Sequence, residues 1–442
     1  EKGLRLQFGM EAVSKSSIGG QLDFAPATDL GTTNNWGMDM NLNRIQGWGK
    51  VGKISANKPW QSFGLQFSGS KDHQNAFFGL NNYTANETVF YSNLIYQNII
   101  KTTDHSFRTG LSLLYDNSEE VLNDSSYLRE EMVSGGYFEY TYKKSNKFAV
   151  VAGLRGDYHN SYGAFVTPRL HLRYSVNDNL VVRGSAGRGW RSPNIIAENK
   201  GLFASSRQII IKGENNDNPF GLKPEIANNY GINITQHFQL GYRDGNITCD
   251  LYKTDFESQV VIDLDQSPQK AVFYNLKGKS YSYSFHLQLD YELINFMNVR
   301  IAYRWYDVKI SYDDELRTKP LISSERAFIN IGYKTIKQLK FDCTLNWQGK
   351  KRIPSTILNP IEFQLDEESP DFIVINAQVS KTWKDKFEVY LGAENLLDFK
   401  QKNPILDSDN PFGEYFDSSM VWGPIFGRII YFGIRYTLKR KQ

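Results

Sequence analysis

Apolar and polar residues alternate along this chain in long runs, most cleanly toward the C-terminus. Between residues 281 and 291 one phase is apolar or aromatic and the other is polar, and the apolar phase reads Tyr281, Tyr283, Phe285, Leu287, Leu289 and Tyr291. Period two places successive side chains on opposite faces of a β-strand. Runs of this kind reach the ~9 to 11 residues that a tilted strand needs to cross a bilayer.

Composition supports a membrane β-barrel over the alternative, a large soluble β protein. Aromatic residues make up 14% of the 442 residues, yet mean hydropathy is -0.48. A barrel with lipid outside and water inside reconciles these values, whereas strands of a soluble sandwich average only about 5 to 6 residues. Tyr281, Tyr291, Trp305 and Trp347 fall at the ends of apolar faces, where interfacial aromatic girdles are expected.

The connections between strands alternate between short and long, as in bacterial outer-membrane barrels, where the short turns are periplasmic. Counting strands between them gives about 18, an even number. The long connections are predicted at Gly69 to Glu87, Asp116 to Ser134, Arg188 to Ala227, Asp263 to Lys279, Asp307 to Ser324, Gly349 to Asp371 and Asn395 to Gly423.

Charge and reactive residues favour neither an enzyme nor a nucleic-acid binder. The net charge is +3, and no basic block with interleaved aromatics occurs. The six histidines are scattered without metal-ligand spacing, and no nucleophile motif is present, so we expect no catalytic residues, no metal and no cofactor. Asp407, Asp409 and Asp417 share one long connection but lack the spacing of a calcium loop, so a hydrated acidic loop is the preferred interpretation. Cys249 and Cys343 are expected to be unpaired.

Residues 187–199 read Gly-Arg-Gly-Trp-Arg-Ser-Pro-Asn-Ile-Ile-Ala-Glu-Asn and end one alternating strand. The glycine spacing does not match a phosphate-binding loop, and Pro193 prevents further ladder pairing around itself. Arg188, Arg191 and Glu198 therefore form a charged cluster at a strand end, facing water or a partner.

At this segment the chain resembles a TonB-dependent outer-membrane receptor, in particular the Bacteroidetes type. Other segments fit in the same order along the chain: Leu-Lys-Pro-Glu at 222–225, Gly-Ala-Glu-Asn-Leu-Leu-Asp at 392–398, Gln-Lys-Asn-Pro at 401–404 and Val-Trp-Gly-Pro at 421–424. The resemblance implies an all-β, antiparallel transmembrane barrel, with about 18 strands in this chain out of a barrel of about 22. It assigns residues 1–442 to the barrel and implies that the plug domain and the first strands lie outside them.

The resemblance also suggests which residues contact the plug. Lumenal carboxylates of the family pair with plug arginines, and Glu198 matches one such position, near Arg188 and Arg191. A second carboxylate usually follows the tyrosine after the Leu-Lys-Pro-Glu run. Here Gly231 follows Tyr230, and Glu225 is the nearby substitute.

The implied function is active import across the bacterial outer membrane of a scarce, bulky solute, such as a ferric siderophore, haem, cobalamin or another metal chelate, with energy supplied through TonB. Expected partners are outer-membrane lipid, the plug, TonB through the plug, the ligand, and a surface lipoprotein or other outer-membrane subunits, but no nucleic acid. Two alternatives remain: a diffusion porin of about 18 strands, and a receptor-like barrel serving as a structural subunit. Loop candidates for ligand capture are Phe203, Arg207, Tyr415 and Trp422.

Overall fold

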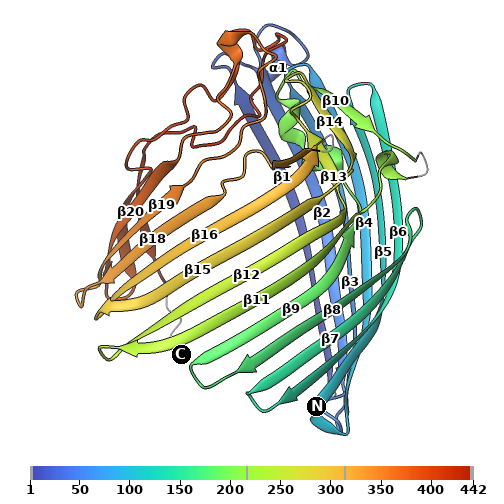
Figure 1. Cartoon of the computed structure of the whole chain (residues 1–442), viewed down its shortest axis with the longest axis vertical. Helices are drawn as coiled ribbons and strands as arrows, with labels where there is room; N and C mark the ends of the chain where they lie inside the picture. The colour runs from blue at the N-terminus through green and yellow to red at the C-terminus, as the bar shows by residue number, and fades with distance from the viewer. Residues whose placement is uncertain (1–2, 216–217, 313–314, 439–442) are drawn as a thin grey trace.

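A computed structural model describes residues 3–215, 218–312 and 315–438 as one curved wall of tilted strands. Within these residues, 19 strands form a single sheet in which neighbours are antiparallel. In Figure 1 the wall curves around an open interior, with short turns at the bottom and irregular segments gathered at the top. None of the helices in the described ranges is long and apolar enough to span a membrane. The expected all-β antiparallel architecture is confirmed.

The strands of the wall follow chain order, so each pairs with its neighbours in sequence. They are β1 (Leu4–Gly20), β2 (Gly37–Ile54), β3 (Ser62–Phe78), β4 (Asn81–Ile100), β5 (Thr102–Leu122), β6 (Ser125–Lys144), β7 (Phe148–His159), β8 (Gly163–Ser175), β9 (Leu180–Arg191), β11 (Glu225–Leu240), β12 (Arg243–Ser258), β15 (Ser280–Ile294), β16 (Met297–Tyr312), β17 (Glu315–Thr318), β18 (Glu325–Lys334), β19 (Leu339–Gln348), β20 (Phe372–Trp383), β21 (Phe387–Glu394) and β22 (Ile429–Tyr436). Strand β17 is a short piece beside β18 on the same edge of β16. The other strands of the wall match the expected number.

Alternation along the strands separates an apolar outer face from a polar inner face. In β22, Ile430, Phe432 and Ile434 are 69%, 64% and 59% exposed, as expected for side chains that lipid covers. Tyr431, on the other phase, donates a hydrogen bond to Gln378 of β20 at 3.2 Å. Tight turns join neighbouring strands at one end of the wall. In the turn between β11 and β12, Gly241 and Tyr242 have positive φ values of 57° and 61°, as a two-residue type I′ hairpin turn requires.

Three of the predicted long connections consist largely of strands of the wall. Residues 69–87 are the ends of β3 and β4, joined at residues 79–80, and residues 116–134 are the ends of β5 and β6, joined at residues 123–124. Between residues 307 and 324, β16 continues to Tyr312 and β17 pairs back onto it. The prediction of long connections there is wrong, because both faces of these extensions carry polar residues and the alternation disappears.

The remaining long connections form a layer over one end of the wall. A second, three-stranded sheet joins β10 (Gln208–Lys212), β13 (Val260–Asp263) and β14 (Lys270–Asn275), with β10 parallel to β14. Short helical turns lie in the same layer: α1 (Pro26–Asp29), α2 (Ile195–Glu198), η1 (Lys200–Phe203), η2 (Pro219–Gly221) and η3 (Ile361–Phe363). The main buried cluster lies between this layer and the extended hairpin of β3 and β4, and it includes Phe78, Tyr83, Ile196, Phe203 and Phe273.

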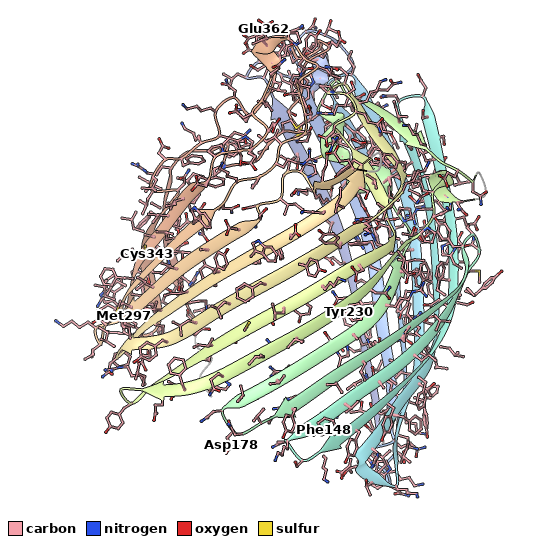
Figure 2. The ribbon with its side chains drawn as sticks, viewed as in Figure 1. Phe148, Asp178, Tyr230, Met297, Cys343 and Glu362 are labelled. Atoms are coloured by element: carbon pink, nitrogen blue, oxygen red, sulfur yellow. The ribbon has the colours of Figure 1, made fainter. Side chains whose placement is uncertain are left out.

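The two outermost strands of the sheet, β1 and β22, each have one neighbour among the described residues and are not paired with each other. Figure 2 shows the ends of the wall through labelled side chains, with Glu362 in the loop layer and Asp178 in a short turn at the opposite end. Cys249 and Cys343 are both free thiols, as expected.

Candidate functional site

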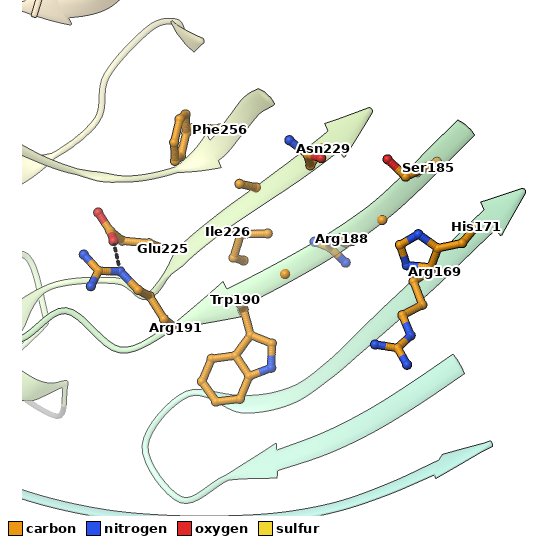
Figure 3. Close-up of a pocket in the computed structure, with 14 residues that line it drawn as sticks. Arg169, His171, Ser185, Arg188, Trp190, Arg191, Glu225, Ile226, Asn229 and Phe256 are labelled. Carbon is orange, nitrogen blue, oxygen red and sulfur yellow. Dashed lines mark hydrogen bonds and ion pairs between the residues drawn. The ribbon is translucent and has the colours of Figure 1, made fainter. Parts of the chain in front are cut away.

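The end of β9 forms the rim of a hollow in the wall (Figure 3). Strand β9 pairs with β8 only as far as Gly187 but with β11 as far as Arg191, so its last residues lose one neighbour. The hollow has a volume of about 440 Å³, and its lining includes Arg169, His171, Trp190, Arg191, Glu225 and Phe256. The glycines of this segment leave it open, since a Cβ at Gly189 would meet no atom within 4 Å.

The charges predicted at this strand end form ion pairs within the chain. Arg191 makes two hydrogen bonds to Glu198, at 2.6 and 3.1 Å, and its Nε donates to Glu225. Arg188 pairs with Glu257, with 2.6 Å between Nη2 and Oε2. The sequence alone did not suggest Glu257 as a partner. The structure therefore brings three of the four predicted plug contacts, Arg191, Glu198 and Glu225, into one network. Their contact with a plug remains a prediction.

Trp190 connects this rim to a largely buried polar cluster on β4, β5, β6 and β7. Its ring stacks on Phe165 with centroids 4.2 Å apart, and Nε1 lies 3.3 Å from Asp157 Oδ2. The edge of the same ring meets His159, which is fully buried. His159 in turn lies 3.6 Å from Glu131.

Arg129 is the centre of the buried cluster. Its guanidinium lies 2.9 Å from Asp116, 2.9 Å from Glu131 and 3.5 Å from Glu87, and its side chain is 6% exposed. These residues come from β4, β5 and β6, so the cluster ties two neighbouring hairpins together. Sequence reasoning missed it because residues 116–134 were predicted to be a loop.

The segment after β9 folds back over this cluster. Pro193 is buried and ends the strand, and Ile195 and Ile196 of α2 are 3% and 1% exposed. The side chain of Asn81 donates to the carbonyl of Phe203 at 2.8 Å. Lys200 donates to Gln74 of β3, and burial lowers the pKa of its ammonium. The long connection is thus a fixed lining of the wall.

Arg207 joins three connections of the loop layer. Its Nε donates to Asp417 at 2.8 Å, and Nη1 donates to the carbonyls of Leu264, Ser267 and Lys270 at 3.4, 3.3 and 3.0 Å. The side chains of Arg207 and Asp417 are 1% and 5% exposed. A buried charge needs this degree of pairing. Asp417 is consequently an internal partner in the network of an arginine.

The four capture candidates occupy two kinds of position. Phe203 and Arg207 are buried and hold the loop layer together. Tyr415 is partly buried and stacks on Phe363 of η3 with centroids 5.3 Å apart. Trp422, also partly buried, packs near Phe372 and Phe399. Capture by any of the four remains a prediction.

The motif at 392–398 has a structural explanation. Asn395 is buried with φ of 52°, its Nδ2 donates to the carbonyls of Phe399 and Phe426, and its Oδ1 accepts from the amide of Phe399. Gln401 is also buried: it donates to the carbonyl of Met420 and accepts from the amides of Trp422 and Gly423. These two amide side chains hold the ends of the connection between β21 and β22 together.

In the part of the chain that the structure describes, no group of three or more histidine, cysteine, aspartate or glutamate side chains could hold a metal ion. Asp407 and Asp409 remain close enough to interact. Partial burial, followed by the charges of Asp409 and Glu362, raises the pKa of the Asp407 carboxyl.

Solved structures of outer-membrane receptors have a similar fold. The ferric-catecholate import receptor Fiu from K12 E. coli, in its closed form, matches with a TM-score of 0.68 at 12% identity, over 98% of this chain and 72% of that chain. The siderophore receptor PiuA from Acinetobacter baumannii matches with a TM-score of 0.65 at 13% identity, over 98% and 72%. A double mutant of the Serratia marcescens hemophore receptor HasR, in complex with its hemophore HasA and heme, matches with a TM-score of 0.64 at 11% identity, over 98% and 69%. At these identities the similarity shows the fold alone.

A relative by sequence is described as the probable TonB-dependent siderophore receptor PirA of Acinetobacter baumannii. It is 25% identical over 142 residues, which is 30% of this chain and 18% of PirA. The match therefore spans less than a fifth of that relative's length.

Residues 5–396 match the family model described as TonB dependent receptor-like, beta-barrel. Barrels of this family lie in the bacterial outer membrane and serve transport, not catalysis. Because the match covers most of the 442 residues, the chain belongs to the TonB-dependent receptor β-barrel family.

Proposed function

We propose that this chain is the barrel of an active-transport receptor that imports a ferric siderophore or a similar iron chelate with energy supplied by TonB. The observation that carries the proposal is the loop layer, in which Arg207 links three connections over one end of a polar-walled lumen. Long connections that are fixed together at one mouth can position side chains to hold a ligand before it enters the lumen. PirA, PiuA and Fiu, which are similar to this chain, are named for siderophores or ferric catecholate.

The proposal includes a plug domain inside the wall and further strands that close the sheet between β1 and β22. Unpaired strand edges are not tolerated in lipid, which supports the additional strands. Arg188, Arg191, Glu198 and Glu225 would meet the plug, with Arg191 exchanging one of its carboxylate partners for a plug residue. TonB would act through that plug. We also propose that the receptor is of the Bacteroidetes type and that a surface lipoprotein is one of its partners.

Ligand capture is assigned to the loop layer. Tyr415 and Trp422 offer partly exposed aromatic surface there, whereas Phe203 and Arg207 would act indirectly, by fixing the loops that carry the contacts.

Growth under iron limitation tests this function. A strain lacking the gene is given one iron source at a time: an anionic ferric tris-catecholate, a neutral ferric tris-hydroxamate or haem. We expect a growth defect on at least one siderophore-type source, restored by the wild-type gene and dependent on TonB. Unchanged growth on every source would reject active iron uptake. Restored growth in the absence of TonB would favour the porin, and normal growth together with co-purified membrane subunits would favour the structural role.

A further inference from the structure

Two arginines on the inner wall have no partner among the residues that the structure describes, unlike nearly all the other arginines. Among the arginines that the structure describes, those whose side chains make no hydrogen bond or ion pair are Arg5, Arg304 and Arg326. Arg304 of β16 lies directly opposite Arg326 of β18 in the strand register. Like charges directly opposite each other across two strands are destabilising.

The surroundings of Arg304 and Arg326 allow water alone to satisfy their N–H donors only poorly. Nε of Arg326 is buried and has no hydrogen-bond partner within the described ranges. The Arg304 guanidinium lies 4.4 Å from the ring centre of Tyr306. Stacking of this kind holds the guanidinium plane but uses none of its N–H donors. A buried donor without an acceptor costs free energy that a bound anion would offset.

A third cation lies near the pair. Lys351 begins the connection between β19 and β20 and forms an isolated bridge with Ser323, three residues before Arg326. Its ammonium donates to the carbonyl of Trp422 and lies 5.8 Å from the ring centre of Phe372. Burial, and then the charge of Arg326, lowers the pKa of Lys351. No described carboxylate neutralises any of the three cations.

The neighbouring carboxylates are already engaged. Glu325 accepts a hydrogen bond from the hydroxyl of Tyr303 at 2.5 Å. Asp371 accepts from the indole of Trp347 at 3.0 Å. Asp250 accepts from Asn233 at 2.7 Å and lies 3.4 Å from His286, the β15 residue opposite Arg304. Within the described residues no carboxylate lies within ion-pair distance of Arg304, Arg326 or Lys351, so an anion that neutralises the patch would come from outside these residues.

We infer that Arg304, Arg326 and Lys351 form an anion-binding subsite on the lumen wall, just beneath the loop layer. The inference rests on the proposed function and narrows its cargo to chelates with negatively charged carboxylate or catecholate oxygens. The subsite lies where a ligand would pass from the loops into the lumen, because Arg326 is the second residue of β18 and Lys351 belongs to the loop layer itself. A ligand held by the loops would meet this patch as it enters the lumen.

Equilibrium binding to the purified full-length receptor in detergent tests the subsite. The probes are the anionic ferric tris-catecholate of 2,3-dihydroxybenzoate and the neutral ferric tris-acetohydroxamate. We expect the double variant Arg304→Gln/Arg326→Gln to raise the Kd for the anionic probe by about tenfold or more, with no change for the neutral probe. The double variant Arg304→Lys/Arg326→Lys should retain most of the affinity. Arg5→Gln removes another unpaired arginine at the opposite end of the wall and is the matched control, expected to bind like wild type.

Three results would overturn the subsite: no preference of the wild type for the anionic probe, equal losses for both probes in the double variant, or unchanged affinity with a lowered Tm. The last result would mean that the two arginines pair with a carboxylate elsewhere in the polypeptide. Import is measured separately in cells. Normal anion binding without TonB-dependent uptake would reject the proposed function and leave the subsite standing.

Discussion

At the scale of single residues, much of the recognisable sequence serves loop geometry. Asn395 illustrates this, because its amide makes three hydrogen bonds to backbone groups on both sides of the last connection while its own backbone is left-handed. Asparagine tolerates that backbone conformation better than most residues. The motif at 392–398 therefore reports how the strand ends, and only indirectly what the receptor binds.

Asn395→Ala should loosen the connection between β21 and β22. Asn403→Ala is the matched control, because Asn403 is also left-handed, with φ of 48°, but is exposed and its side chain makes no hydrogen bond to any residue that the structure describes. The difference between the two variants isolates the hydrogen bonds and should be about 1 to 3 kcal/mol of local stability. Amide hydrogen exchange at Phe399 measures it. Equal effects of the two substitutions would mean that backbone conformation alone matters.

Asp398 gives this connection a dependence on pH. Accepting the amide N–H of Arg428, at 2.8 Å, lowers the pKa of its carboxyl, with smaller contributions from Lys400 and Arg428. A carboxyl whose pKa is lowered by folding stabilises the fold above its unfolded value of about 3.9, and this contribution is lost as pH falls through the folded pKa. Protection of the Arg428 amide, measured relative to the intrinsic exchange rate at each pH, should therefore fall below about pH 4. In Asp398→Asn this loss of protection should be absent.

At the scale of elements, the alternation of apolar and polar residues predicted the strands that have one face against lipid. It did not predict the strand segments that extend beyond the lipid. Residues 281–291 were predicted correctly because one face meets lipid and the other meets water. Residues 116–134 were not, because on β5 and β6 both faces there meet water or other parts of the protein. The buried cluster around Arg129 was hidden for the same reason. Its members are brought together by strand register, which no local pattern encodes.

Arg129→Met should weaken the extended hairpins without disturbing the rest of the wall. The substitution leaves the buried carboxylate of Glu131 and the partly buried carboxylates of Asp116 and Glu87 without their shared cation, and breaking such a network costs about 3 to 5 kcal/mol. Exchange at residues 81–87 and 116–131 should rise, while β11 and β12 stay protected. Arg44→Met is the control, since Arg44 pairs with Asp72 at 3.4 Å but is 43% exposed, and such pairs contribute about 1 kcal/mol or less. Similar effects from both substitutions would contradict the assigned role of the cluster.

At the scale of the whole molecule, the two ends of the wall differ in kind. One end carries the loop layer, the extended hairpins and the cationic patch, and the other carries short turns. In an outer-membrane barrel the long connections are extracellular and the short turns periplasmic. Capture from outside requires that orientation, so the sidedness of this chain can be tested independently of any ligand.

Cysteine labelling in intact cells tests the orientation. Glu362→Cys and Asp178→Cys, each in a Cys249→Ser/Cys343→Ser background, place one exposed thiol at either end of the wall, at the positions labelled in Figure 2. A membrane-impermeant maleimide should modify the Glu362→Cys variant in intact cells, and the Asp178→Cys variant only after the outer membrane is permeabilised. The thiol-free background controls for other reactions. The reverse pattern would turn the loop layer toward the periplasm, where neither Tyr415 nor Trp422 could meet an external chelate and the cationic patch would face the exit of the lumen.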